Sequence, residues 1–375
     1  MSKRKFCFFA GTGRHNKEVL IFRQAKVLAE SGYDVEYVVN DNEGDTIIDD
    51  LRISSTGYGF KGYLSRMLIA PVFILRKLFL LDADIYQTCS IDQIFVCLLL
   101  KLKGKKIIFH LREAHPYTLL RKLSRHMFLA KIITSLMAIY MKFALRYFDA
   151  VFVVTQDIYD YVSKWGVGKV YMQGNYPFIN KDYSLSFEDY EKRDNCIIYF
   201  GSIYRNSCQE AMLDALSGVE NVKYLIAGKF WNNVSYQKKL ENHPKWKDVD
   251  FIDGFDIKEL PLLLKRATIS NVLRDFVSSE TPNGSLGIIK IFESMEAALP
   301  LICSDVQVYR DIMKEYRCGL LVDPNNSEQI QKAVEYLVNN KEEAWKMGQE
   351  GRRAVIEKYS WDAVSKEYCS IIDNF

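Results

Sequence analysis

The 375-residue chain contains 49% hydrophobic and 26% charged residues, the balance of a folded globular protein, which excludes a disordered or low-complexity chain. Because one hydrophobic core rarely grows beyond about 250 residues, this length predicts two domains. The eight cysteines include no C-x-x-C pair, which favours reduced thiols over disulfides or a zinc site. The apolar run from Phe6 to Ala10 is shorter than a secretory core, so we expect a cytoplasmic protein.

Charge is distributed unevenly along the chain. The net charge is +3, but residues 1–180 carry 25 basic and 16 acidic residues, whereas residues 181–375 carry 25 and 31. The excess is concentrated in residues 61–148, where 15 basic and 4 acidic residues are interleaved with long apolar stretches. This basic, apolar region predicts a surface that meets a partner.

The first half of the chain alternates short apolar runs with helical patterns. Residues 5–10 are followed by Gly11-Thr12-Gly13, a helical pattern from Val19 to Ala29 and a β-rich run at 34–40, which together indicate a βαβ unit. We therefore predict a doubly wound α/β domain over residues 1–176, with an interdomain linker at 177–195. Further runs supporting it lie at 85–87, 91–102, 106–110, 119–148 and 150–155.

The second half repeats this alternation and predicts a second α/β domain over residues 196–358. We expect residues 359–375 to form a last helix, capped by Ser360, that packs back on the first domain. Open α/β sheets bind ligands at the carboxyl ends of their strands, so the active site is expected between the domains. The strand-like runs are 196–200, 222–227, 250–252, 269–273, 299–304 and 319–322.

The strongest local signal is the segment 278–305, a polar loop followed by an amphipathic helix and a buried strand. Small residues before a helix let backbone N–H groups approach a diphosphate, and the helix dipole favours its charge. Lys290 is placed to neutralise phosphate, and Glu293 to accept the hydroxyls of a ribose. The alternative is an ordinary turn before a helix with a solvated lysine and glutamate. The small residues are Gly284, Ser285 and Gly287.

This segment, followed by residues 319–324, 347–352 and 359–361, resembles the carboxyl-terminal signature of the retaining glycosyltransferases of family 4, which have the GT-B fold. The resemblance implies two Rossmann-like doubly wound domains facing across a cleft. It implies transfer of a sugar from a nucleotide diphosphate with retention of configuration. It also implies that the diphosphate is met by basic side chains and a helix dipole, with neither metal nor cofactor.

The resemblance also implies roles for single residues on the donor side. Gly201 and Arg205 stand where the family has a glycine and a basic residue that meets the phosphates. Gly254 and Phe255 are similar to the loop that holds the base. The backbone of Ser285, Leu286 and Gly287 would bind the diphosphate. One departure is Ser285, which replaces the first of two glutamates, the one that contacts the transferred sugar; Glu293 matches the second.

The first domain resembles the family through residues 23–35 and 107–116, which look like parts of bacterial polysaccharide glycosyltransferases. Aligned on Glu113, the family's histidine falls on Arg112 and its aspartate on His110. The catalytic imidazole then comes from His110 or His115, and a hydrogen-bonded loop histidine is the alternative for each. Acceptor-side roles are implied for Gly11, Arg112 and Glu113, and a donor-phosphate role for Gly13.

Two further motifs are weak evidence for a binding site. Asp82-Ala83-Asp84 has the Asp-x-Asp pattern of metal-dependent transferases, but it precedes a strand of the wrong domain for the donor, so we expect no metal site. The Gly-x-Gly-x-x-Gly pattern that begins at Gly11 is incomplete, because Asn16 occupies its last position.

Segments 61–81 and 119–148 mix aliphatic and aromatic residues with Lys and Arg, and neither offers about 20 apolar residues free of charge. We predict interfacial helices on an anionic membrane surface, and hence a peripheral protein at the inner face of the cell membrane. Core helices with solvated charged faces are the alternative, and nucleic acid as a partner is disfavoured.

The predicted reaction moves a sugar, from a UDP-sugar by resemblance, to a lipid-linked or polysaccharide acceptor. A non-catalytic GT-B partner subunit is the competing hypothesis.

Overall fold

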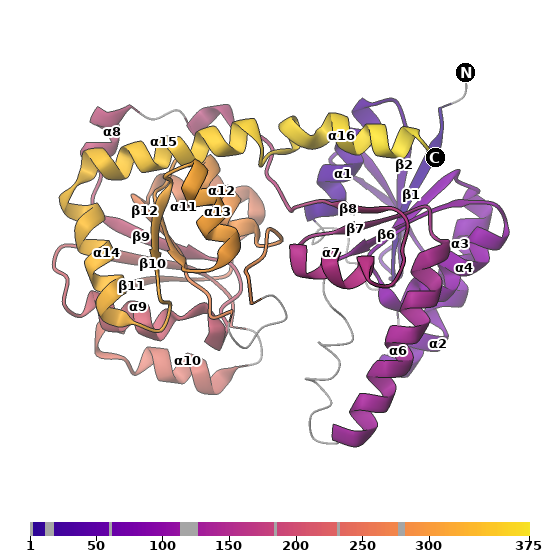
Figure 1. The fold of residues 1–375 in the computed structure, drawn as a ribbon, viewed down its shortest axis with the longest axis horizontal. Coiled ribbons are helices and arrows are strands. Elements are labelled where there is room, and N and C mark those ends of the chain that lie inside the picture. Colours follow the sequence, from indigo (N-terminus) through magenta and orange to yellow (C-terminus); the bar gives the residue numbers. More distant parts are fainter. Residues whose placement is uncertain are drawn as a thin grey trace. The chain divides into compact units, whose positions relative to one another are not determined.

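In the computed structural model, the chain divides into two compact units, residues 1–175 with 365–375 and residues 176–364 (Figure 1). The structure describes residues 3–11, 19–59, 62–112, 127–183, 186–230, 233–276 and 282–375. All eight cysteines are free thiols, as their spacing predicts.

The first unit is built on an eight-stranded sheet in the order β3-β4-β2-β1-β5-β6-β7-β8. All neighbouring strands run parallel except β3 and β4, which form an antiparallel pair at one edge. Its central strands are apolar on both faces because helices cover both faces of a parallel sheet. The strands are β1 (Lys5–Ala10), β2 (Asp34–Val39), β3 (Thr46–Ile48), β4 (Leu51–Ser55), β5 (Ile85–Thr88), β6 (Lys106–Leu111), β7 (Ala150–Val153) and β8 (Val170–Met172).

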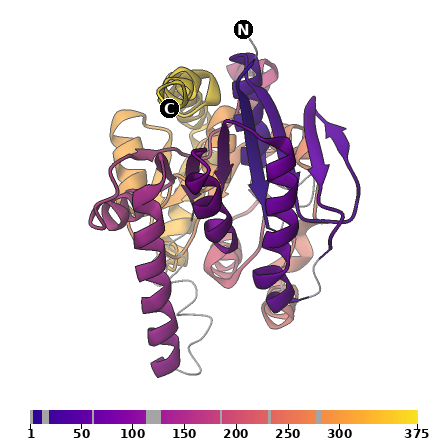
Figure 2. The same cartoon turned by 90° about the vertical axis from the view of Figure 1, so that its right-hand side faces the viewer.

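One face of this sheet is covered by α3, α4, α6 and α7, whose buried side chains share a core with Phe9, Phe109 and Val153 of the strands. Figure 2 shows α3, α4 and α6 on the same side of the sheet. The helices of this unit are α1 (Val19–Glu30), α2 (Tyr63–Leu68), α3 (Ala70–Leu81), α4 (Ile94–Leu102), α6 (Met127–Tyr147) and α7 (Gln156–Ser163).

The opposite face holds α1 and the end of α16 (Trp361–Asp373). Three buried polar side chains join them to the sheet: the Gln87 amide donates to Gln24 at 3.0 Å, and the Tyr368 hydroxyl donates to Gln87 at 3.2 Å. The Tyr33 hydroxyl also donates to Asp373 at 2.5 Å. Residues 365–375 therefore complete the first unit from the far end of the sequence.

The second unit has a six-stranded, all-parallel sheet in the order β11-β10-β9-β12-β13-β14. Chain order reverses between the neighbours β9 and β12, so their carboxyl ends diverge into a crevice. The strands are β9 (Cys196–Phe200), β10 (Lys223–Gly228), β11 (Val249–Asp253), β12 (Ile269–Val272), β13 (Leu301–Ser304) and β14 (Gly319–Val322). The helices are α8 (Phe187–Glu191), α9 (Gln209–Leu216), α10 (Val234–Glu241), α11 (Leu260–Lys265), α12 (Ile289–Glu296), α13 (Gln307–Glu315), α14 (Ser327–Asn339) and α15 (Lys341–Glu357).

The start of α16 is fixed within the second unit. The Ser360 hydroxyl accepts from the N–H of Ala363 at 3.1 Å, which confirms the predicted helix cap. The N–H of Trp361 donates to the Pro177 carbonyl at 2.8 Å. Arg352 of α15 donates to the carbonyls of Glu296 and Asn180 at 2.5 and 2.9 Å. Asn180 lies just after the start of this unit at Tyr176, so α15 anchors the beginning of the unit.

Candidate functional site

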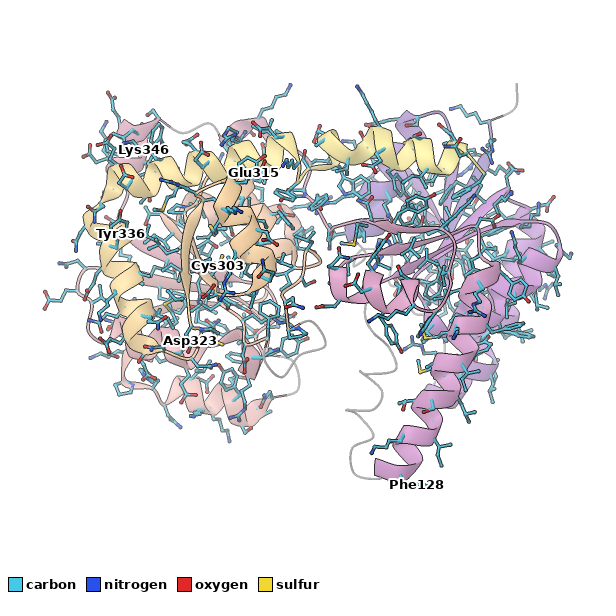
Figure 3. All side chains as sticks on the ribbon, viewed as in Figure 1. Phe128, Cys303, Glu315, Asp323, Tyr336 and Lys346 are labelled. Atoms are coloured by element: carbon cyan, nitrogen blue, oxygen red, sulfur yellow. The ribbon has the colours of Figure 1, made fainter. Side chains whose placement is uncertain are left out.

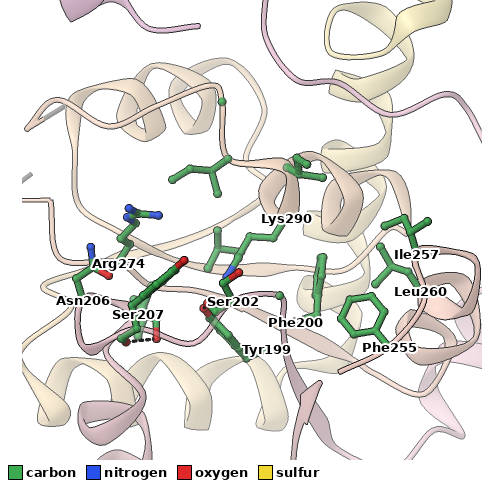
Figure 4. A pocket seen from close by; sticks show the side chains of 17 residues that line it. Tyr199, Phe200, Ser202, Asn206, Ser207, Phe255, Ile257, Leu260, Arg274 and Lys290 are labelled. Atoms are coloured by element: carbon green, nitrogen blue, oxygen red, sulfur yellow. Dashed lines mark hydrogen bonds between the residues drawn. The ribbon is translucent and has the colours of Figure 1, made fainter. Parts of the chain in front are cut away.

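A cavity of about 380 Å³ lies at the reversal of chain order in the second unit, within the usual size range of ligand pockets (Figure 4). It opens where β9 ends at Phe200 and Gly201, where β12 ends at Val272, and where α12 begins at Ile289. None of the described residues that line it is acidic. Position and charge together suit an anionic ligand.

Lys290 provides the first cation of this cavity. It lies in the first turn of α12, and its Nζ is 3.7 Å from the ring centroid of Tyr199, an attractive cation–π distance. A Cβ placed on Gly201, whose φ is +101°, would lie 3.9 Å from this Nζ. The ammonium therefore faces the glycine turn after β9, where a ligand can approach the backbone closely.

The pKa of Lys290 lies well below the ordinary lysine value, first because enclosure by the cavity walls strips water from the ammonium, and second because Arg274 adds a like charge. The residue as a whole keeps partial exposure, since the side chain faces the open cavity. An arriving anion would restore the lost solvation and favour the charged form.

Arg274 provides the second cation, and the sequence analysis did not identify it. Its backbone is held just after β12 by Ser304, whose hydroxyl accepts from the Arg274 N–H at 2.8 Å and donates to the Arg274 carbonyl at 2.7 Å. Its Nε is buried and has no hydrogen-bond partner among the described residues. A buried guanidinium nitrogen without a partner is costly, which indicates that a ligand completes it.

The opposite end of the cavity is apolar. Figure 4 shows Phe255, Ile257 and Leu260 on one side of Lys290, and Arg274 and Asn206 on the other. The cavity thus has a flat, apolar end and a cationic end, the pattern expected for a ligand with one planar group and one anionic group.

The amino-terminus of α12 contributes backbone donors. Gly287, Ile288 and Ile289 line the cavity, and no side chain of the described residues caps this helix. The first N–H groups of a helix need partners and attract anions. One of the predicted donors is already used, because the N–H of Gly287 donates to the Ser285 hydroxyl at 3.0 Å.

Several predicted donor-side residues lie outside the described lining. The Arg205 guanidinium lies 5.6 Å from the ring centroid of Tyr236. Glu293, buried to 7% exposure, lies one helical turn beyond Lys290. Gly254 has a φ of +80° and precedes the lining residue Phe255. The structure thus brings Gly201, Phe255, Gly287 and Lys290 together, whereas Arg205, Gly254, Ser285, Leu286 and Glu293 surround this group without lining the cavity.

In the first unit, His110 is fully buried on β6, and its ring centroid lies 6.0 Å from that of Phe152. Burial, and to a lesser degree the charge of Arg112, lower the pKa of His110 well below the ordinary value, which favours the neutral imidazole. Neither ring nitrogen finds a partner in the described parts of the chain. Gly11 directly follows β1, and its N–H donates to the Ser90 hydroxyl at 3.3 Å. Gly13, Glu113 and His115 lie outside the described residues.

The Asp-x-Asp carboxylates have structural partners. Asp82 forms an ion pair with Lys105 at 2.8 Å, and Asp84 accepts from the backbone N–H of Lys5 at 2.8 Å. Both precede β5, at the edge opposite the carboxyl ends of the strands. In the described residues, no cluster of three or more His, Cys, Asp or Glu side chains could hold a metal ion.

The basic, apolar segments form α2, α3 and the long α6. None of the helices in the described part of the chain is long and apolar enough to cross a membrane.

Two family models match the chain one after the other. The model of glycosyltransferase family 4 matches residues 18–173, and the model of glycosyl transferases group 1 matches residues 185–354. An uncharacterized glycosyltransferase of Methanocaldococcus jannaschii is 26% identical over 211 residues, which span 52% of this chain and 47% of that protein. The match therefore covers about half the length of that curated relative.

Solved structures share the fold over nearly the full length. Sucrose-phosphate synthase from Thermosynechococcus elongatus superimposes with a TM-score of 0.73 at 13% identity and covers 99% of each chain. Anabaena HepE in complex with UDP-glucose gives a TM-score of 0.73 at 12% identity, covering 99% of this chain and 100% of that one. TarM of S. aureus gives 0.74 at 11% identity, covering 98% and 99%. The two α/β units, one on a mainly parallel and one on an all-parallel sheet, and the two matched models together show that the chain belongs to the glycosyltransferases of GT-B fold.

Proposed function

We propose that this protein transfers a sugar from a nucleotide diphosphate donor, a UDP-sugar, and that the cavity between β9, β12 and α12 holds that donor. The observation that carries the proposal is that two cations, Lys290 and Arg274, line the same cavity, whose described lining contains no carboxylate. The apolar end at Phe255 and Ile257 suits a nucleotide base. HepE, which shares the fold, was solved with UDP-glucose, and this supports the choice of uridine.

In the proposed reaction, the bond between the anomeric carbon and the diphosphate breaks, the oxygen of an acceptor hydroxyl forms the new glycosidic bond, and the proton of that hydroxyl passes to the departing diphosphate. The main chemical burden is the negative charge that develops on the departing diphosphate. Lys290, Arg274 and the first N–H groups of α12 are already in place for this charge, so little reorganisation is needed during the reaction. Retention of configuration and independence from metal follow from the family resemblance and are part of the proposal.

We assign Arg205 and Glu293 supporting roles on the donor side, the first toward phosphate and the second toward the ribose hydroxyls. Both lie next to the cavity rather than in its described lining. Their predicted contacts therefore require the bound donor to extend beyond the cavity. The proposed acceptor is a lipid-linked or polysaccharide glycan at a membrane surface, consistent with the basic and apolar helices of the first unit.

The test is calorimetric binding of UDP, GDP and dTDP and of their sugar derivatives to the purified chain. We expect UDP to bind most tightly, and Glu293→Ala to weaken UDP binding while leaving binding of inorganic pyrophosphate nearly unchanged. Binding of a donor together with its hydrolysis or transfer would support the enzyme. Absence of binding for the whole panel would contradict the donor site.

A second candidate function is a non-catalytic subunit that supports another glycosyltransferase. It is favoured by one observation, namely that Ser285 stands where the family often has a glutamate, and its hydroxyl is engaged by the Gly287 N–H. This candidate predicts nucleotide binding without turnover for every donor and acceptor pair, so a single positive transfer assay removes it.

A further inference from the structure

The helix α6 is apolar on two opposite faces. One face, from Met137 to Phe148, belongs to the core of the first unit. The opposite face is exposed, although a helix on the surface of a soluble domain normally carries polar residues there. Its apolar residues repeat every three or four positions, and each is between 42% and 80% exposed: Phe128, Ile132, Leu136, Ile139, Phe143 and Tyr147.

The amino-terminal half of α6 extends beyond the sheet, with Phe128 near its far end (Figures 1 and 3). The residues that this helix adds to the core shared with α3 and α4 begin at Met137, although Ala130 and Thr134 in its first half are also buried. The exposed stripe therefore runs along a projecting helix rather than across a concave surface.

Exposed apolar residues continue on the neighbouring helices α3 and α4, which share the core of α6. Val72 and Leu80 of α3 are 63% and 77% exposed, and Leu102 of α4 is 84% exposed. In the second unit, by contrast, the exposed large apolar residues are distributed over several separate elements and form no stripe along one helix: Tyr204, Val234, Ile257, Leu262, Tyr336 and Ile356. Exposed apolar side chains gathered on neighbouring helices in this way are typical of an interaction site. We call the outward sides of α3, α4 and α6 the apolar face.

The charges that border the apolar face are all of one sign on α3 and α6. These two helices contain five basic residues and no Asp or Glu: Arg76, Lys77, Lys131, Lys142 and Arg146. Lys77 pairs with Asp45, Arg146 donates to the Trp165 carbonyl and Lys142 is half-buried, whereas Arg76 and Lys131 are exposed beside the apolar stripes. A basic border around exposed aliphatic and aromatic side chains fits anionic headgroups above an acyl layer.

We infer that the apolar face is the surface by which this protein docks on an anionic lipid bilayer, with the exposed stripe of α6 inserted at the boundary between headgroups and acyl chains. The bilayer is the favoured occupant because it matches the apolar stripe and the basic border at once. A second copy of the chain would bring the same basic border against itself. The inference deepens the proposed function, since it rests on an acceptor that is presented at a membrane.

The test is flotation of the full chain with vesicles of phosphatidylcholine alone or of phosphatidylcholine with phosphatidylglycerol. We compare wild type with Leu136→Glu/Ile139→Glu and with the matched control Val234→Glu/Ile356→Glu, which places the same charges on exposed positions of the second unit. We expect binding to the anionic vesicles only, a loss of about tenfold or more in the stripe variant, and no loss in the control. A Phe128→Trp reporter should shift its emission to the blue on adding anionic vesicles.

Two results would overturn the inference. The first is equal vesicle binding, or none, for wild type and the stripe variant. The second is a concentration-dependent dimer, measured by sedimentation, that the stripe variant abolishes, because a second copy would then cover the face. UDP calorimetry on wild type separates the two proposals: UDP binding without vesicle binding removes only the docking surface, and vesicle binding without UDP binding removes only the donor site.

Discussion

Both units reverse chain order beside their first strand, but they place opposite chemistry at that point. In the first unit, β1 and β5 are neighbours there, and the space is filled by Asp92, which pairs with Arg66 at 3.0 Å and accepts from the Gln93 amide at 2.8 Å. In the second unit, Lys290 and Arg274 face a cavity. The reversal of strand order determines where a crevice forms, and the side chains that follow the strands determine which ligand it accepts.

The glycines at these two positions are also different. A Cβ on Gly11 would lie 1.9 Å from the Asp92 carboxylate, so this glycine admits a side chain of the protein itself. A Cβ on Gly201 would meet only the end of Lys290, at 3.9 Å, so this glycine leaves its space open. The predictions that follow test whether the difference between the two sites is functional.

The largest effect is expected for Lys290→Ala. Removing a cation that faces the departing diphosphate should lower turnover by about 100-fold or more, because stabilisation of developing charge is a dominant catalytic term. The measurement is kcat with a UDP-sugar, together with unfolding to show an intact fold. Lys314→Ala, on an exposed position of α13, is the matched control. Full activity of Lys290→Ala would contradict the phosphate role.

A smaller effect, about tenfold in UDP affinity, is expected for Arg274→Ala, since a hydrogen bond to a charged group contributes about 1.5–3 kcal/mol. Arg274→Lys should recover part of the affinity, because it keeps the charge and loses the planar fork. Calorimetry measures both variants against Arg317→Ala, an exposed arginine of the same unit. Equal UDP affinity in all three would place the buried Nε outside the donor site.

At the other reversal point, Asp92→Asn should change stability rather than donor affinity. It breaks the pair with Arg66 and leaves buried donors facing one another, at a cost of about 1–3 kcal/mol in the free energy of unfolding. Asp82→Asn, which loses an exposed pair with Lys105, should cost less than Asp92→Asn, because solvent screens an exposed ion pair. Denaturant unfolding and UDP calorimetry test this. A large loss of UDP affinity in Asp92→Asn would show that both reversal points serve the donor.

The last effect concerns the dependence of stability on pH. Because the pKa of Lys290 is lowered in the folded chain, the folded state binds fewer protons than the unfolded state between that pKa and about 10.4, the ordinary lysine value. Its contribution to stability therefore increases as pH rises through this window, with a slope of at most about 1.4 kcal/mol per pH unit. Between pH 7 and 9.5, the free energy of unfolding of wild type should rise relative to that of Lys290→Met. Parallel pH profiles would contradict the lowered pKa.

The sequence predicted the alternation of strands and helices well where apolar runs were flanked by glycine. The run 196–200 is β9 to the residue, and 106–110 falls within β6. The antiparallel β3–β4 pair was not predicted, because its strands are short and lie among acidic residues. Local pattern is sufficient for a strand whose neighbours are buried, but not for a short edge hairpin.

The candidate site was only partly predictable. Lys290 and Gly287 follow from one segment with helical spacing, so the sequence identified them. Arg274 lies just after β12 and joins the site only because β12 pairs with β9 across a long crossover. The sequence did offer a signal for Arg274. It directly follows the strand-like run 269–273, of which β12 is the greater part, and the carboxyl ends of parallel strands meet at one edge of the sheet, where ligands bind. The burial of His110 could not be predicted, because it depends on Phe152 of the neighbouring strand β7.

The return of α16 to the first unit has a consequence for how the chain matures. Tyr368 and Asp373, which bond to Gln87 and Tyr33, leave the ribosome only after the whole of the second unit. The first unit therefore waits with Gln24, Gln87 and an apolar sheet face uncovered while its neighbour is synthesised. Domains translated first are commonly the first to finish folding. Here the order of completion is reversed, and the end of one helix closes the unit that was begun first.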